Sequence, residues 1–199
     1  MNSSTTAQTP DVRERILAHG QRIMAGKGYA AVGINEVLTA AGVPKGSFYH
    51  YFGSKDGFGE AMLDAYFEDY LSEIDATLGK PGQTGAQRLM NYWKNWQATQ
   101  SVQDCQGKCL AVKLGAEVAD LSEAMRLSLK RGTAGIVDRL AKGIEAGVAD
   151  KSLSISGKPA ELAQSLYQLW LGASIMVKIG RDKQPFDVAM ATTRKLLGV

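Results

Sequence analysis

Two cysteines lie four positions apart near the middle of the chain, and their thiols are the side chains best suited to covalent chemistry. Cys109 follows Gly107, which we expect to end a loop or to open a helix. A thiol in the first turn of a helix meets free backbone N–H groups. These groups lower its pKa, as do nearby cations such as Lys108 and Lys113. Because the thiolate is the species that attacks electrophiles and oxidants, the sequence predicts a reactive thiol at Cys109.

Two further residues have the chemistry to assist this thiol. Cys105 follows an aspartate, whose negative charge opposes ionisation, so it is the less reactive cysteine. It could resolve an oxidised Cys109 as a disulfide if the chain breaks at Gly107, because that bridge is strained within a regular helix. Lys178 ends the apolar run 169–179, and partial burial there would lower its pKa. The alternative is a lysine whose stem lies along the surface and whose charge favours the end of a helix.

A second group of polar side chains, around residues 45–55, is typical of contacts with nucleic acid. Lys45, Ser47 and Tyr49 can donate hydrogen bonds to phosphate, and Gly46 lets the backbone approach closely. His50 and Lys45 can reach the edges of bases. Lys55 opens the following helix, where free N–H groups also favour phosphate.

Two short helices would carry these residues. Residues 34–41 and 44–51 read as helices joined by a turn at Gly42, which is helix–turn–helix spacing. We expect Pro44 in the first turn of the second helix. The apolar side chains of that helix anchor it on the core; they are Phe48, Tyr51 and Phe52.

The other predicted elements are helices as well. The first starts with Thr9 as N-cap and Pro10 at the first helical position, and it stops at Gly26 and Gly28. Ser54 caps a longer helix that reaches about residue 78. Beyond a boundary at 79–85 we expect helices at about 84–101, 107–118, 121–148, 157–180 and 185–197. No segment has the alternation of a strand. The prediction is an all-α fold of about nine helices, with a DNA-binding domain at 1–54 and a regulatory and dimerisation domain at 55–199.

Residues 40–55, AAGVPKGSFYHYFGSK in one-letter code, resemble the TetR family of bacterial repressors. The resemblance covers about 50 N-terminal residues, and the helical remainder suits the ligand and dimer domain of that family. It implies that Asn35 touches the backbone or a base of operator DNA. It also implies a homodimer, since one short recognition helix reads few base pairs and two heads read two half-sites. The helix at 157–180, with the stripe Leu162, Leu166, Leu169, Ala173 and Met176, is the expected dimer surface, completed by the last helix.

Residues 107–122 and 169–179 resemble the NemR group of TetR-type repressors. Members of that group sense reactive electrophiles and oxidants and control detoxifying reductases. By this resemblance Cys109 is the sensing cysteine and Lys178 its partner. The predicted function is a homodimeric repressor that leaves its operator when Cys109 is modified.

Two other functions compete with the thiol switch. One is a repressor induced by a small hydrophobic ligand that binds without a covalent bond. The candidate pocket residues are Trp93, Trp96, Tyr167 and Trp170. The other is a thiol-dependent enzyme, which we do not expect because no cysteine–histidine pairing is evident.

Composition narrows the class of protein further. The chain has 199 residues, a net charge of +3 and two histidines, so DNA binding must come from placed groups rather than from a bulk basic field. The cysteines and histidines lack the spacing of a metal site, and we expect no metal or cofactor. Residues 1–10 have no apolar segment of a secretory signal, and no stretch is long enough to cross a membrane. We therefore expect a cytoplasmic protein with reduced thiols.

Overall fold

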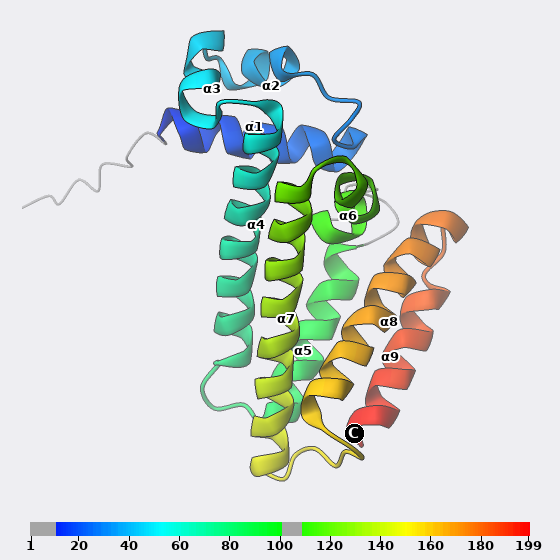
Figure 1. The fold of residues 1–199 in the computed structure, drawn as a ribbon. Coiled ribbons are helices and arrows are strands. Elements are labelled where there is room, and N and C mark those ends of the chain that lie inside the picture. The colour runs from blue at the N-terminus through cyan, green and yellow to red at the C-terminus, as the bar shows by residue number, and fades with distance from the viewer. Residues whose placement is uncertain (1–10, 101–108) are drawn as a thin grey trace, which may run out of the picture.

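The computed structural model describes residues 11–100 and 109–199, and over those ranges it contains nine helices and no strand (Figure 1). This confirms the predicted all-α class. The first four helices are α1 (Val12–Lys27), α2 (Ile34–Ala41), α3 (Lys45–Phe52) and α4 (Lys55–Leu78). The other five are α5 (Gly85–Thr99), α6 (Leu110–Leu121), α7 (Glu123–Ala149), α8 (Pro159–Gly180) and α9 (Gln184–Leu197).

The ends of the N-terminal helices follow from local chemistry. Gly42 and Gly28 end α2 and α1 with φ angles of 65° and 92°, conformations that suit a residue without a Cβ. Ser54 caps α4, because its side chain accepts a hydrogen bond from the N–H of Gly57 at 3.0 Å. All three were predicted as helix ends.

Three boundaries differ from the prediction. Helix α1 begins at Val12 with Asp11 as N-cap, so the predicted start at Thr9 and Pro10 is wrong, and those two residues lie outside the described ranges. Gly26 lies inside α1 rather than ending it. Pro44 is the N-cap of α3, with the extended backbone of ψ 153°, and not a member of its first turn.

The first three helices form a head at one end of the molecule, and α4 runs from this head along the C-terminal helices (Figure 1). In the head, the ring of Phe48 on α3 packs 5.3 Å from the ring of Phe58 on α4, and Ile16 of α1 is buried in the same core. Because α4 belongs to both parts, a displacement at its far end can change the position of the head. The boundary between residues 54 and 55 stays a prediction.

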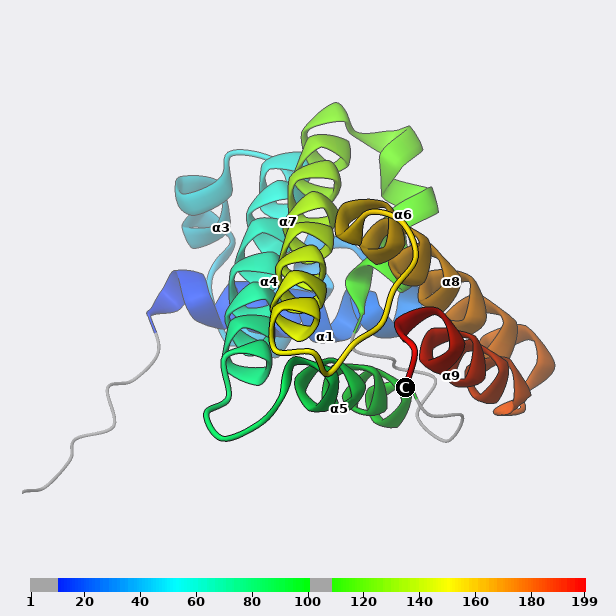
Figure 2. The ribbon, with the colours of Figure 1, turned by 90° about the horizontal axis from the view of Figure 1, so that it is seen from below.

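The long helices α4 and α7 lie side by side, and α5, α8 and α9 complete the C-terminal bundle (Figures 1 and 2). Gly132 permits this close approach, since a Cβ at that position would lie 2.1 Å from the Phe67 ring. Short α6 packs against α7 and α8 and also contacts α1 of the head. No helix in the described part of the chain is long and apolar enough to cross a membrane.

Candidate DNA-binding surface and thiol site

The exposed face of α2 and α3 carries the predicted DNA contacts. Asn35, Lys45, Gly46 and His50 are exposed and Ser47 is half-buried, while Tyr49 has 46% of its surface exposed. The other face of α3 anchors it, because Phe48 is fully buried and Phe52 nearly so. Hence α3 presents polar groups outward from a fixed apolar base, which is what entry into a DNA groove requires.

Gly46 of α3 leaves an open surface beside the exposed side chains. A Cβ at Gly46 would meet no atom within 4 Å, so nothing inside the chain requires a glycine at that position. The ammonium of Lys45 lies 5.9 Å from the centroid of the Tyr49 ring, so the cation and the phenol form one exposed cluster. Gly46 leaves the backbone beside this cluster accessible to a partner.

Two residues of this region lie differently from expectation. Tyr51 is 37% exposed, so the prediction that it anchors α3 in the core is wrong; its ring packs against His50, 5.1 Å between centroids. Lys55 is half-buried, and its Nζ donates to the carbonyl of Tyr29 at 3.0 Å. Lys55 therefore holds the head together, and its role at phosphate stays a prediction.

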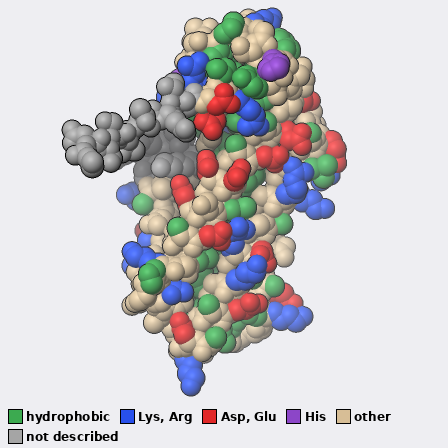
Figure 3. All heavy atoms as spheres, turned by 90° about the vertical axis from the view of Figure 1, so that its left-hand side faces the viewer, with side chains coloured by type: hydrophobic (Ala, Val, Ile, Leu, Met, Phe, Trp, Pro, Cys, Tyr) green, Lys and Arg blue, Asp and Glu red, His purple; other side chains and the backbone are tan. Residues whose placement is uncertain are grey.

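The charged surface is mixed. On the face shown in Figure 3, acidic and basic side chains alternate along the body of the molecule, and no large field of one sign covers it. Ion pairs also join α4 to α7, among them Arg131 with Asp64 and Arg139 with Asp75. The expectation that contacts with DNA come from placed groups of α2 and α3 stays a prediction.

Cys109 is the N-cap of α6, so the prediction that this thiol lies at the start of a helix is confirmed in position. Only 3% of the residue is exposed. Lys178 lies in the last turn of α8, and its Nζ atom is buried rather than extended into solvent. Cys105, Gly107 and Lys108 lie outside the described residues.

The prediction that the pKa of Cys109 is lowered is wrong. Burial raises the pKa of the thiol, because the charged thiolate is poorly solvated in an apolar interior. The backbone N–H groups of Val112 and Ala111, the hydroxyl of Tyr66 and the charge of Lys178 all act in the opposite direction, but burial outweighs them. The sequence pointed to a helix start and nearby cations that lower the pKa, but it did not reveal the burial of the thiol, which raises the pKa by more.

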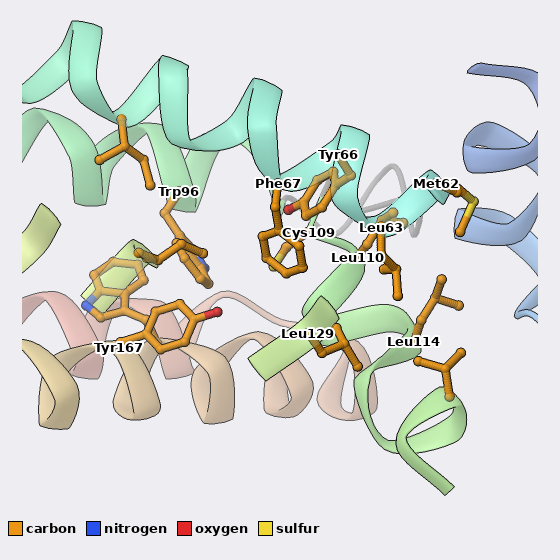
Figure 4. Packing of buried hydrophobic residues seen from close by; sticks show 14 of the residues in the cluster. Met62, Leu63, Tyr66, Phe67, Trp96, Cys109, Leu110, Leu114, Leu129 and Tyr167 are labelled. Carbon is orange, nitrogen blue, oxygen red and sulfur yellow. The ribbon is translucent and has the colours of Figure 1, made fainter. Parts of the chain in front are cut away.

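Tyrosine side chains lie beside the thiol. Figure 4 shows Tyr66 of α4 and Tyr167 of α8 on two sides of Cys109, with their hydroxyls directed toward it. Burial raises the pKa of Tyr66 and of Tyr167, and a thiolate at Cys109 would raise both further. Sequence reasoning missed Tyr66, because a tyrosine on an apolar helix stripe reads as ordinary core.

The predicted pocket residues are brought together next to this site. Trp93 stacks on Trp170 at 4.9 Å between ring centroids, and Trp96 meets Tyr167 edge to face at 5.9 Å. All four are buried. The indole N–H of Trp96 donates to the Ser174 hydroxyl at 2.9 Å. They form a packed aromatic core whose member Tyr167 lies beside Cys109 (Figure 4), and their role in binding a ligand stays a prediction.

The predicted dimer stripe divides between core and surface. Leu162, Leu166 and Ala173 are buried inside the chain, so the prediction that they form the dimer surface is wrong. Helical periodicity found the apolar stripe, but it could not tell that α7 and α9 cover it. The exposed apolar side chains of α8 and α9 are Ile175, Met176, Ile179, Val188 and Leu196.

Both parts of the chain match known families. Residues 16–62 match the bacterial regulatory proteins of the tetR family, and residues 85–193 match the tetracyclin repressor-like C-terminal domain. The HTH-type transcriptional repressor NemR of Escherichia coli (strain K12) is 39% identical over 191 residues, which are 94% of this chain and 94% of NemR. The chain belongs to the TetR family. The N-terminal match contains α2 and α3, so the exposed polar face lies in the family's helix–turn–helix.

Other relatives agree with this assignment. The HTH-type transcriptional repressor DhaR of a Mycobacterium species (strain GP1) is 34% identical over 181 residues, 91% of this chain and 89% of DhaR. The crystal structure of E. coli NemR in its reduced form superposes with a TM-score of 0.89 at 38% identity, covering 94% of this chain and 97% of that one. The protein is thus a TetR-type transcriptional repressor, and its relatives are regulators rather than enzymes.

Proposed function

We propose that the protein represses transcription as a homodimer on operator DNA and is released when Cys109 reacts with an electrophile or an oxidant. The observation that carries the proposal is the setting of this thiol. It is buried at the start of α6, with backbone N–H groups, a phenol and the Lys178 charge placed to favour its ionised form. A helix N-terminus and a nearby lysine are settings that lower the pKa of reactive thiols.

The reaction is an addition with a steric consequence. With a quinone, the sulfur bonds to a ring carbon, the displaced electron pair moves to the quinone oxygens, and the ring becomes a hydroquinone that carries the two protons released. With a peroxide or hypochlorite, the sulfur takes one oxygen atom and becomes a sulfenic acid, and the oxidant is reduced to an alcohol or water, or to chloride. Either product is larger than a thiol, and the site is closely packed by Tyr66 and Leu110. Extra atoms in a packed core displace their surroundings, here α6 and α4.

The exposed apolar face of α8 and α9 supports the proposed homodimer. Met176 and Ile179 are 53% and 70% exposed. Gly172 lies one helical turn before Met176, and a Cβ there would meet no atom within 4 Å. A second copy of the same face would bury these side chains and place two heads at a fixed separation. A change in that separation releases operator DNA.

The test is operator binding before and after treatment with a quinone, an aldehyde or hypochlorite. We expect the wild type to lose affinity at least tenfold and Cys109→Ser to lose none. Cys105→Ser is the matched control, since it removes the other thiol. Release of Cys109→Ser to the same extent as the wild type would refute the thiol switch.

The alternative is induction by a reversible hydrophobic ligand, and the aromatic cluster of Trp93, Trp96, Tyr167 and Trp170 favours it. A ligand would have to separate these stacked rings. If a ligand that cannot react with thiols reversibly releases the Cys109→Ala variant from operator DNA, this alternative is supported.

A further inference from the structure

Helix α6 reaches the DNA-binding head through one carboxylate. The backbone N–H of Ala30 donates to Oε1 of Glu117 at 2.7 Å, and that of Tyr29 donates to Oε2 at 3.1 Å. These two amides follow directly after Gly28, which ends α1. A single side chain of α6 thereby binds the segment between α1 and α2, 88 positions away in sequence.

The surroundings are shaped for this contact. Gly28 has a φ of 92°, and a Cβ added to it would lie 3.1 Å from Oε2 of Glu117. A side chain at position 28 would thus be strained and would crowd the carboxylate. Two N–H groups that converge on one carboxylate make charge-assisted hydrogen bonds, which are stronger than neutral ones.

Tyr29 extends the connection to the start of α4. Its carbonyl accepts a hydrogen bond from Nζ of Lys55 at 3.0 Å, and its hydroxyl donates to the carbonyl of Lys55 at 2.9 Å. Lys55 is the first residue of α4 and lies three positions after the end of α3. The group of Glu117, Tyr29 and Lys55 therefore joins α6 to the corner that orients the exposed face of α3.

The other end of α6 is Cys109. Cys109 lies eight positions before Glu117, so their backbones are about 12 Å apart along the axis of one short helix. Leu110, Leu114 and Val118 bury one side of this helix in the core. A rigid element of about three turns that is displaced at one end must also move at the other.

We propose that Glu117 is the positioning residue that transmits the reaction of Cys109 to the DNA-binding head. The trigger rests on the function proposed above, while the linkage rests on the contacts of Glu117. Displacement of α6 pulls the carboxylate from the amides of Tyr29 and Ala30, and the head is then free to turn away from operator DNA.

The experiment compares the wild type, Glu117→Ala and Glu117→Gln, each with Cys109 alkylated by N-ethylmaleimide to the same extent by mass spectrometry. The readout is the operator Kd after alkylation divided by the Kd before. We expect this ratio to fall at least tenfold in Glu117→Ala, with an intermediate value in Glu117→Gln, which keeps one acceptor oxygen. Asp120→Asn, an exposed carboxylate on the same helix, is the matched control and should keep the wild-type ratio. A wild-type ratio in Glu117→Ala would overturn the proposal.

Hydrogen exchange of the wild type tests the linkage separately from DNA release. Alkylation should accelerate exchange of the Tyr29 and Ala30 amides at least tenfold, and unchanged exchange would overturn the proposal. This measurement also decides the matter if Glu117→Ala does not fold. If the alkylated wild type stays bound to its operator while exchange at these amides is accelerated, the thiol switch is refuted and the linkage is supported.

Discussion

The raised pKa of Cys109 predicts a titration opposite to that of an activated thiol. Burial moves the pKa above the ordinary value of 9.0. At pH 7.5 the thiolate fraction is then below about 3%. A helix N-terminus acting alone would lower the pKa to about 7.5 or less, and at least about half of the thiol would be ionised. The structure therefore predicts that the reduced protein carries a neutral sulfur under ordinary conditions.

The assay is the ultraviolet absorbance of the thiolate, followed from about pH 6 upward as the difference between the wild type and Cys109→Ser. The subtraction removes Cys105 and the tyrosines. We expect no step in the difference below about pH 9, since each pH unit below the pKa reduces the thiolate tenfold. A step with its midpoint below about pH 8 would refute the reasoning, because the polar groups at the start of α6 would then outweigh burial.

Two further predictions test the thiol site and the packing of α4 against α7. Lys178→Met should raise the pKa of Cys109 further, because it removes a positive charge that favours the thiolate; slower alkylation at fixed pH measures this, and an unchanged rate would contradict it. Gly132→Ala should lower the free energy of unfolding by about 1–3 kcal/mol, because its Cβ would lie 2.1 Å from the Phe67 ring. Gly115→Ala is the control in an open position on α6 and should be neutral or stabilise by up to about 1 kcal/mol in chemical denaturation; equal effects of the two would contradict the packing argument.

Local chemistry made much of the fold predictable. Ser54, Gly28 and Gly42 end or begin helices through contacts with near neighbours in sequence, so their roles follow from residue type and spacing. The helix–turn–helix was predictable for the same reason, because its turn and its apolar anchors Phe48 and Phe52 lie within about a dozen residues.

The errors arose where distant segments meet. The burial of Cys109 depends on side chains from other helices, among them Tyr66 of α4 and Tyr167 of α8 (Figure 4), and no local pattern reports how closely separate helices pack. Likewise, the spacing of Leu162 and Leu166 defines a face of α8 but not the neighbour that covers it. Glu117 gave no signal, since its partners lie at positions 29 and 30.

Burial of the thiol also changes what can set the selectivity of the proposed switch. A thiol that is exposed and ionised reacts with any accessible electrophile, at a rate set by its own acidity. Cys109 is neutral and enclosed, so a reagent must first enter or await local opening of α6, and the size and polarity of the reagent then matter. Opening removes the cost of burial, so the thiol becomes more acidic as it becomes accessible. In the proposed switch, the close packing around Cys109 has two effects. It keeps the resting thiol unreactive, which preserves the repressing state, and it leaves no room for the adduct, which displaces the surrounding helices and releases the operator.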